Sequence, residues 1–294
     1  MRPVLDLVTA GDAFDDFIFH SLVRLPAAGQ ELKTNAFSRT CGGGAVITAV
    51  AAARLGLRCA VMSGLSGDAA RLLRDESVAV RNLRLRDEPT AITVALSTRR
   101  ERRFVTFNGM NDRLPGRLLR RLPRARARHV HLAFPPQPCR PWIAAVDRLR
   151  RRGISTSWDF GWNPELGRDP AFPALARSVD YLFLNRDEAL AYARQRRLTA
   201  AIDRWRRAPR HVVIKLGAAG SRIVGAGVDL RAPGMRVRVV DTTGAGDAFN
   251  AGFLVARLRG GTILRALRLG NRVGALSTRA PGGIAALPRG SEVS

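Results

Sequence analysis

The residues best suited to chemistry lie in one run, Asp241–Phe253, which reads Asp-Thr-Thr-Gly-Ala-Gly-Asp-Ala-Phe-Asn-Ala-Gly-Phe. The pattern predicts that an amphipathic helix begins within this run and continues to Leu258. Three small residues, Gly244, Ala245 and Gly246, stand at its predicted start. Small residues leave the backbone N–H groups accessible, and the helix dipole adds partial positive charge there. The run therefore predicts an anion-binding site.

Asp247 falls in the first turn of the predicted helix. An aspartate at this position is often no more than a good helix-start residue. A carboxylate beside an anion site is also where a general base for phosphoryl transfer is expected. The pattern GxxxxGK[ST] does not occur in the sequence, which excludes a P-loop enzyme.

The surrounding pattern predicts an α/β fold with a mostly parallel central sheet flanked by helices on both faces. Short apolar stretches, mostly separated by helical stretches, predict strands at Val4–Ala10, Arg58–Ser63, His129–Leu132, Ile154–Trp158, Tyr181–Leu184, Val212–Leu216 and Val237–Val240. The stretch Ala45–Gly56 follows three glycines and predicts a helix. Residues 90–107 alternate with a period near two and predict a hairpin with charged residues 99–102 at its turn.

Ligands of such sheets bind beyond the carboxyl ends of the strands. This rule selects the loops that start at Gly11, Asn185, Gly217 and Asp241, all of which carry polar or glycine residues.

The run Asp241–Phe253 resembles the C-terminal signature of the ribokinase-like carbohydrate kinases, the PfkB family. Other parts of the chain resemble the family in the same order, so that the resemblance extends from residue 4 to about 288. These parts are Gly11–Asp16, Gly42-Gly43 with Ala49–Gly56, Gly67-Asp68, the hairpin from Pro89, Asn185–Glu188 and Leu216–Gly220.

The resemblance implies an ATP-dependent kinase that phosphorylates a hydroxyl of a sugar or sugar-like molecule, with Mg²⁺ and, as in many members, K⁺. It implies that Asp247 is the general base and that Gly244, Ala245 and Gly246 form the anion hole. The implied acceptor-binding residues are Asp16, Gly42, Gly43 and Asp247. The implied nucleotide-binding residues are Asn185, Lys215, Gly217, Gly220, Gly246 and Asn271. Glu188 would position Mg²⁺ through water, and Asp241 and Thr243, with the loop 277–286, would bind a monovalent cation.

The resemblance also implies one domain, residues 1–294, with a small β-sheet lid formed by insertions at about 14–40 and 88–108. Dimerisation through lid strands is common in the family, so a homodimer is an expectation. Ile47 stands where the family usually has an asparagine that contacts sugar hydroxyls, and the missing contact makes plain ribokinase specificity doubtful.

The acceptor class stays open between several alternatives. Sugars or sugar acids come first, and nucleosides second. A nucleoside would need an aromatic lid contact, for which Phe104 and Phe107 are candidates. A sugar acid would need converging arginines, and Arg103 is one among many.

The composition is that of an ordinary globular protein except for its charge. Lys and Arg number 49 against 24 Asp and Glu, so the net charge of the 294 residues is +25. The arginines occur along almost the whole chain, which favours an arginine-rich surface over a nucleic-acid site. A non-catalytic protein that binds a metabolite or nucleic acid is a rival hypothesis, but the intact Asp247 and Asn185–Glu188 argue against it.

Three scattered cysteines, the lack of a signal peptide pattern and the lack of a long apolar run predict a cytoplasmic protein without a membrane partner. His129 and His131 could share a metal, although buried structural residues are the favoured interpretation. Trp158–Trp162 could line a pocket or pack in the core, and Asp159 within it is a candidate for supporting the site.

Overall fold

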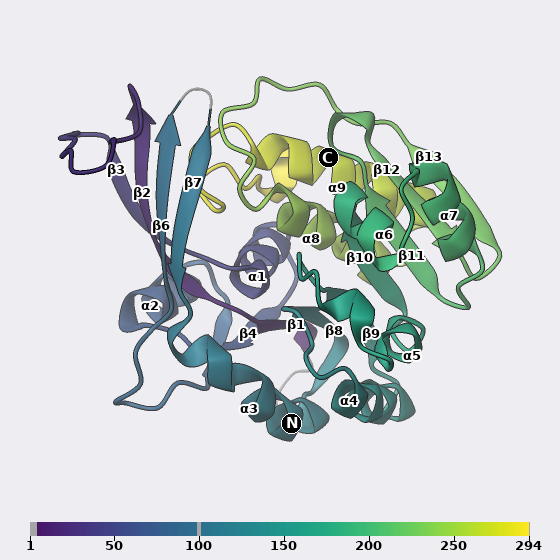
Figure 1. Cartoon of the computed structure of the whole chain (residues 1–294). Helices are drawn as coiled ribbons and strands as arrows, with labels where there is room; N and C mark the ends of the chain where they lie inside the picture. The colour runs from purple at the N-terminus through teal and green to yellow at the C-terminus, as the bar shows by residue number, and fades with distance from the viewer. Residues whose placement is uncertain (1–4, 99–100, 294) are drawn as a thin grey trace.

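A computed structural model describes residues 5–98 and 101–293. Its largest element is a nine-stranded sheet with the strand order β13-β12-β11-β10-β9-β8-β1-β4-β5 (Figure 1). All neighbouring strands are parallel from β11 to β5, and β12 and β13 are antiparallel additions at one edge. The strands are β1 Leu5–Gly11, β4 Cys59–Ser63, β5 Ala79–Asn82, β8 Ala127–Ala133, β9 Ser155–Asp159, β10 Tyr181–Asn185, β11 His211–Lys215, β12 Ser221–Gly225 and β13 Val228–Ala232.

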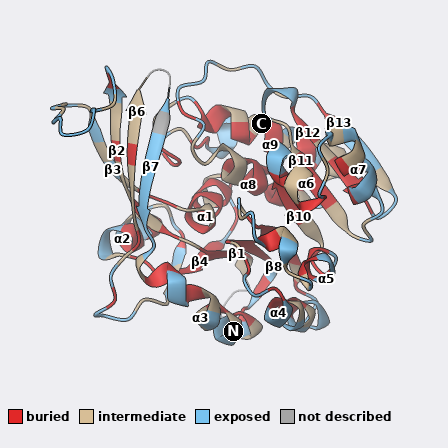
Figure 2. Cartoon of the chain, in the orientation of Figure 1, coloured by how far each residue is buried: buried red, intermediate tan, exposed pale blue. Residues whose placement is uncertain are grey.

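Helices cover both faces of this sheet, as Figures 1 and 2 show. One face packs against α1 Gly44–Arg54, α2 Gly67–Asp75, α8 Ala245–Leu258 and α9 Ile263–Ser277. The other packs against α3 Leu114–Arg121, α4 Arg140–Arg151, α5 Phe172–Ala176, α6 Arg186–Tyr192 and α7 Leu198–Arg206. Short 3₁₀ turns lie at Gly109–Arg113, Leu122–Arg124, Leu166–Arg168, Gly217–Ala219 and Gly290–Glu292. The predicted α/β architecture is confirmed.

Helix α8, which carries the run singled out above, is more buried than predicted. Every residue from Ala248 to Ala256 is buried, because α1 and α9 pack on sides of the helix that the sheet leaves open. The prediction of an amphipathic helix is therefore wrong, although its end at Leu258 is confirmed. A helix enclosed in this way holds its N-terminus firmly in place.

A separate four-stranded sheet stands beside the main body, with the order β3-β2-β6-β7 (Figure 1). Its strands are β2 Phe14–Leu22, β3 Phe37–Gly42, β6 Ile92–Thr98 and β7 Arg102–Phe107. β6 and β7 form the predicted hairpin, and residues 99 and 100 of its predicted turn lie outside the described residues. That the chain forms one domain with a lid stays a prediction.

The predicted strand Val237–Val240 is wrong. The chain leaves the sheet at the end of β13, since Pro233 has no N–H group to continue a ladder. The backbone N–H groups of Val240 and Asp241 donate instead to the carbonyl oxygen of Thr278, after α9. Residues 233–240 thus form an irregular segment that connects β13 to the loop before α8.

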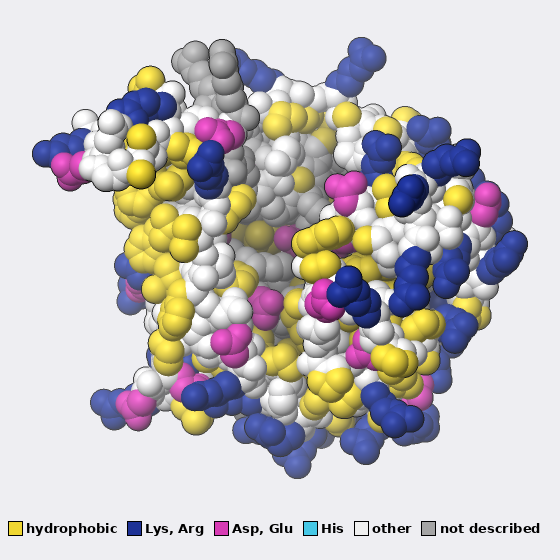
Figure 3. Space-filling model, viewed as in Figure 1, with side chains coloured by type: hydrophobic (Ala, Val, Ile, Leu, Met, Phe, Trp, Pro, Cys, Tyr) yellow, Lys and Arg dark blue, Asp and Glu magenta, His cyan; other side chains and the backbone are white. Residues whose placement is uncertain are grey.

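The basic side chains are dispersed. On the face shown in Figure 3, Lys and Arg side chains are scattered over several elements instead of forming one block. No helix within residues 5–98 and 101–293 is both long enough and apolar enough to cross a membrane.

Candidate functional site

The N-terminus of α8 has the geometry expected of an anion site. Gly244, the residue before the helix, has φ 73°, a left-handed conformation that favours glycine and turns the chain into the first helical turn. Asp247 follows in that turn, and its backbone carbonyl accepts a hydrogen bond of 3.2 Å from the Thr48 hydroxyl of α1. Its carboxylate lies only 3.0 Å from where a Cβ at Gly44 would be. The local sequence and α1 together position this carboxylate.

The charge state of Asp247 is sensitive to its surroundings. Burial raises the pKa of its carboxyl to about 7, and the nearby carboxylates of Asp159 and Glu188 act in the same direction, while the Lys215 ammonium opposes them. A carboxyl with a pKa near neutrality is suited to accepting a proton at physiological pH.

A cavity of about 220 Å³ separates Asp247 from the small sheet. Three of the predicted acceptor-binding residues, Asp16, Gly43 and Asp247, line it. The full lining is Phe14, Asp16, Ile18, Gly43, Ile47, Thr93, Ala95, Ser97, Phe104, Asp241, Thr243, Gly244 and Asp247. Burial raises the pKa of the Asp16 carboxyl to about 7, and neighbouring Asp15 adds to the effect.

Gly42, also predicted to bind the acceptor, supports the cavity from behind. A Cβ at this position would lie 2.0 Å from Oδ2 of Asp16. The glycine is therefore required for the carboxylate of Asp16 to occupy its place on β2.

We expect Gly42→Ala to weaken binding of the acceptor that Asp16 is predicted to contact, because the added methyl group must displace that carboxylate. The expected result is an acceptor KM raised about tenfold or more, corresponding to the loss of one charged hydrogen bond, with the ATP KM little changed. Gly67→Ala is a suitable control, since a Cβ there meets nothing within 4 Å. Steady-state kinetics with each substrate varied would measure the effect. An unchanged acceptor KM would contradict the assigned contact.

A second cavity, of about 550 Å³, opens on the other side of the α8 N-terminus. Five predicted nucleotide-binding residues line it: Lys215, Gly217, Gly220, Gly246 and Asn271. The irregular segment described above contributes Gly234, Met235, Arg236, Val237 and Val239. Gly244 and Asp247 line the first cavity while Ala245 and Gly246 line the second, so the predicted anion site lies between the two.

Asn271 shapes the second cavity as well as lining it. Its side-chain amide donates to the carbonyl oxygens of Ala232 and Pro233 at 3.2 and 2.9 Å. These bonds attach α9 to the start of the irregular segment.

Lys215 belongs to a buried group of polar side chains beside the N-terminus of α8. Its Nζ lies 2.5 Å from Oδ2 of Asp159 and 3.1 Å from where a Cβ at Gly246 would be. The Asn250 amide donates to the same Asp159 oxygen at 2.7 Å. Burial alone would raise the pKa of the Asp159 carboxyl, but the Lys215 ammonium and both hydrogen bonds lower it. Burial would lower the pKa of Lys215, but Asp159, Glu188 and Asp247 raise it.

Asn185 and Glu188 form a capping box at the start of α6. The Asn185 side chain accepts from the Glu188 N–H at 2.9 Å, and Glu188 Oε2 accepts from the Asn185 N–H at 2.8 Å. Burial raises the pKa of the Glu188 carboxyl to about 7, with a further contribution from Asp159. Neither residue lines the two cavities. No cluster of three or more His, Cys, Asp or Glu residues suited to a metal ion occurs in the described part of the chain.

Asp241 connects two loops. Its Oδ1 accepts from the Thr243 N–H at 2.6 Å and its Oδ2 from the Gly282 N–H at 2.8 Å. The carboxylate thereby ties the loop before α8 to the predicted cation loop 277–286.

Of the remaining residues that the sequence suggested, some line a cavity and others pack in the core or lie exposed. His129 and His131 are buried and hydrogen-bonded to the hydroxyl groups of Ser155 and Ser157, and burial lowers their pKa values to about 3 and about 4. Neutral core residues are thus the better interpretation. Phe104 lines the first cavity.

Phe107 and Arg103 do not line this cavity, and Arg103 is exposed and paired with Glu101.

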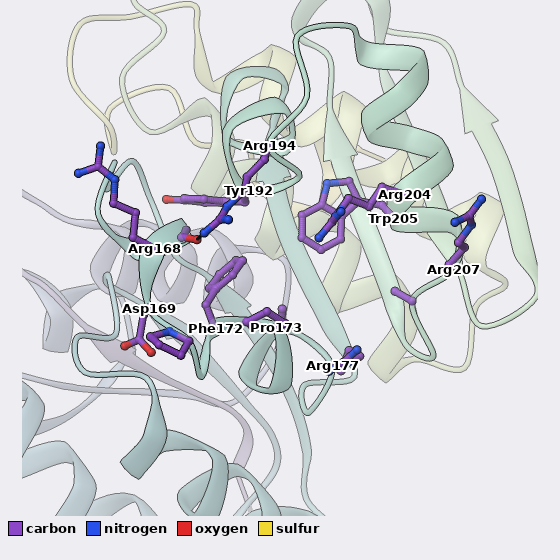
Figure 4. Close-up of a pocket in the computed structure, with 14 residues that line it drawn as sticks. Arg168, Asp169, Phe172, Pro173, Arg177, Tyr192, Arg194, Arg204, Trp205 and Arg207 are labelled. Carbon is purple, nitrogen blue, oxygen red and sulfur yellow. Dashed lines mark hydrogen bonds between the residues drawn. The ribbon is translucent and has the colours of Figure 1, made fainter.

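A further cavity of about 410 Å³ lies away from these residues, among α5, α6 and α7 (Figure 4). Although five arginines line it, Arg168 is bonded to Glu165 and Arg194 to the Gly167 carbonyl. Its one acidic residue, Asp169, accepts from the N–H groups of Cys139 and Ala171. None of the predicted site residues lies in this cavity.

Sequence reasoning missed the contribution of Asn250. It stands three residues after Asp247 in α8, a spacing that places both on one helix face, and this was the available signal. Thr93, Ala95 and Ser97 on β6 were also missed. Their alternation does indicate that they share a face, but which face meets the cavity depends on the sheet's position.

The chain is similar in sequence and in fold to known kinases. The family model described as pfkB family carbohydrate kinase matches residues 4–289. A 2-dehydro-3-deoxygluconokinase of Bacillus subtilis (strain 168) is 29% identical over 310 residues, covering 97% of this chain and 93% of that protein. The fold is similar to that of adenosine kinase from Sinorhizobium meliloti, with TM-score 0.81, 22% identity and coverage of 97% and 98%. It is also similar to that of Arabidopsis thaliana ribokinase complexed with ribose and ATP, with TM-score 0.79, 22% identity and coverage of 99% and 98%.

Proposed function

The chain belongs to the pfkB family of carbohydrate kinases, and we propose that it transfers the γ-phosphate of ATP to a hydroxyl of a neutral sugar-like acceptor. One observation carries the proposal. The Asp247 carboxylate and the N-terminus of α8 lie between two cavities of about 220 and 550 Å³, one for each substrate. The larger one suits a nucleotide and the smaller one a single sugar ring.

In the proposed reaction, Asp247 accepts the proton of the acceptor hydroxyl as its oxygen bonds to the γ-phosphorus. The bond from phosphorus to the β–γ bridging oxygen breaks, and ADP leaves with that electron pair. The N–H groups at residues 244–247 and the Lys215 ammonium stabilise the charge on the transferred phosphoryl group. Asp16, which lines the same cavity as Asp247, binds acceptor hydroxyls.

We assign Asn185 and Glu188 the role of holding water around Mg²⁺. Their carboxylate and amide oxygens suit an ion that prefers hard oxygen ligands and retains water, and the single carboxylate fits an indirect role. Mg²⁺ bound to the phosphates would neutralise part of their charge. The loop tied by Asp241 keeps its proposed role in monovalent cation binding, so the assay below includes K⁺. Three free, buried cysteines accord with a cytoplasmic reaction.

We favour a neutral acceptor over a sugar acid. The described residues that line the smaller cavity include Asp16, Asp241 and Asp247 and no Lys or Arg, so an added carboxylate would meet like charge. The name of the Bacillus subtilis relative indicates a sugar acid for that protein.

A nucleoside is the second candidate acceptor. Phe104 lines the smaller cavity from β7, and an aromatic ring is a group on which a nucleobase stacks. One relative in structure is an adenosine kinase. Dimerisation through the lid remains a prediction.

The deciding experiment measures ADP release with ATP, Mg²⁺ and K⁺ over ketoses, aldoses, sugar acids and nucleosides. We expect turnover with neutral sugars that exceeds turnover with acids of the same ring size. Higher turnover with nucleosides than with free sugars would favour the second candidate. ATP binding without turnover on any acceptor would contradict the kinase assignment.

We also expect a pH dependence. The general base must be deprotonated, and the pKa of Asp247 is about 7, so kcat/KM for the acceptor should fall about tenfold per pH unit below that value. Measurement from pH 5.5 to 8.5 in buffers of constant ionic strength would test this. A flat profile across neutrality would argue against Asp247 as the base.

A further inference from the structure

The smaller cavity has a lining of mixed chemistry. Asp16 and Asp247 contribute carboxylates. The apolar members of the lining are Phe14, Ile18, Ile47, Ala95 and Phe104, and the members with hydroxyl groups are Thr93, Ser97 and Thr243. Among the apolar members, Ile47 belongs to α1, the helix that contacts Asp247.

Ile47 is fixed against the glycines that border the anion site. Its Cδ1 lies 2.8 Å from where a Cβ at Gly244 would be and 2.5 Å from the same point at Gly283. The two glycines thus make the room that the isoleucine fills, and the side chain is 3% exposed. Its last accessible surface faces the cavity.

Ile47 also lies beside the proposed base. Gly44, three residues earlier in α1, approaches the Asp247 carboxylate, and Thr48, one residue later, donates to the Asp247 carbonyl. The part of an acceptor that touches Ile47 is therefore close to the hydroxyl that reacts.

A hydroxyl held against Ile47 would lose its water and gain no hydrogen bond, because an alkyl group neither donates nor accepts. A C–H group in the same place would lose nothing and would gain apolar contact.

On the basis of the proposed kinase function, we propose that Ile47 selects acceptors that carry a deoxy carbon near the phosphorylated hydroxyl. The chemical class is a neutral deoxy sugar or deoxynucleoside. The parent compound with a hydroxyl at that carbon is the poorer substrate.

The test uses pairs of acceptors that differ by one hydroxyl. Ribose and 2-deoxyribose, glucose and 2-deoxyglucose, and adenosine with its 2′-deoxy and 3′-deoxy forms serve as probes. We expect kcat/KM to favour the deoxy member of at least one pair by about tenfold or more in the native protein. Dissociation constants from calorimetry compare the binding of the deoxy and parent compounds without turnover.

Two variants of nearly equal shape isolate the polar effect. Ile47→Val keeps an alkyl wall, whereas Ile47→Thr places a hydroxyl where one methyl group was. We expect the valine variant to keep the deoxy preference and the threonine variant to reduce it about tenfold. Thermal unfolding of both variants controls for folding, and the native ratio decides the question should either variant fail to fold.

The outcomes separate the two proposals. Turnover with a preference for the parent compound in every pair would overturn the role of Ile47 and leave the kinase intact. The same ratio in the valine and threonine variants would also overturn it. Failure of every acceptor to bind or react would overturn both proposals.

Discussion

Asp247→Asn is expected to lower kcat by about 10²- to 10⁴-fold, the usual contribution of a general base. The amide has almost the shape of the carboxylate but cannot accept the acceptor's proton. The KM for ATP should change little, since the second cavity and Lys215 are untouched. Initial rates of ADP release at saturating substrates measure the effect.

The same variant should be at least as stable as the native protein. The pKa of Asp247 is raised to about 7 in the folded chain, so the charged carboxyl disfavours folding above its usual pKa of 3.8. Removing that charge removes the penalty, and thermal unfolding at pH 8 should show an equal or higher midpoint. An inactive and stable variant is typical of a residue kept for function.

Asp75→Asn is the matched control, because Asp75 is an exposed carboxylate at the end of α2. It should leave both kcat and the unfolding midpoint unchanged. A decrease in kcat of less than about tenfold in Asp247→Asn would contradict the role of Asp247 as the general base. A lowered midpoint in that variant would show that the loss reflects structure.

Lys215→Met is expected to reduce both catalysis and stability. The ammonium lies beside the anion site, so kcat/KM for ATP should fall about 10²-fold or more. The Asp159 carboxylate would remain buried without its partner at 2.5 Å, which should lower the free energy of unfolding by about 3 kcal/mol. Kinetics with ATP varied and urea unfolding would measure the two effects.

A second substitution separates these effects. In the double variant Asp159→Asn with Lys215→Met, no buried charge of the pair remains, so much of the lost stability should return while the activity stays low. Recovery of activity would show that Lys215 serves only to neutralise Asp159. Equal destabilisation of the single and double variants would show that the pair is not coupled.

The pair also predicts a pH dependence of stability. The pKa of Asp159 is lowered from 3.8, so its contribution is present above that value and is lost as pH falls through the folded pKa. The pKa of Lys215 is raised from 10.5, so its contribution is present below that value and is lost as pH rises through the folded pKa. The Asp159–Lys215 pair itself therefore contributes throughout neutral pH. The carboxyls of Asp247 and Glu188 have pKa values of about 7, and the Lys215 ammonium favours their charged forms. The stability difference between native and Lys215→Met protein, measured by urea unfolding, should thus grow as pH rises through about 7.

Features made by neighbouring residues could be predicted from the sequence. The glycine-rich start of α8 and Asp247 lie within a few residues of each other, and the hairpin of β6 and β7 follows from a period near two. In each case the atoms that act together are a few residues apart, so backbone geometry alone brings them together. The resemblance to one family added predictions at separated positions, of which Asp16 and Lys215 line the two cavities.

Contacts between residues far apart in the sequence were decided by tertiary packing. Asp159, Lys215 and Asn250 meet across 56 and 91 residues of sequence, and no local pattern encodes their approach. The stretch Val237–Val240 has the composition of a strand, yet the carbonyl oxygen of Thr278 accepts from the N–H group of Val240 and the stretch stays irregular.

Ile47 shows the same division between sequence and structure at a single position. The sequence alone determined that an alkyl group stands there. Only the tertiary structure decided that this group lies against Gly244 and Gly283 and lines the smaller cavity, because which side of a buried helix meets a cavity depends on everything packed around it.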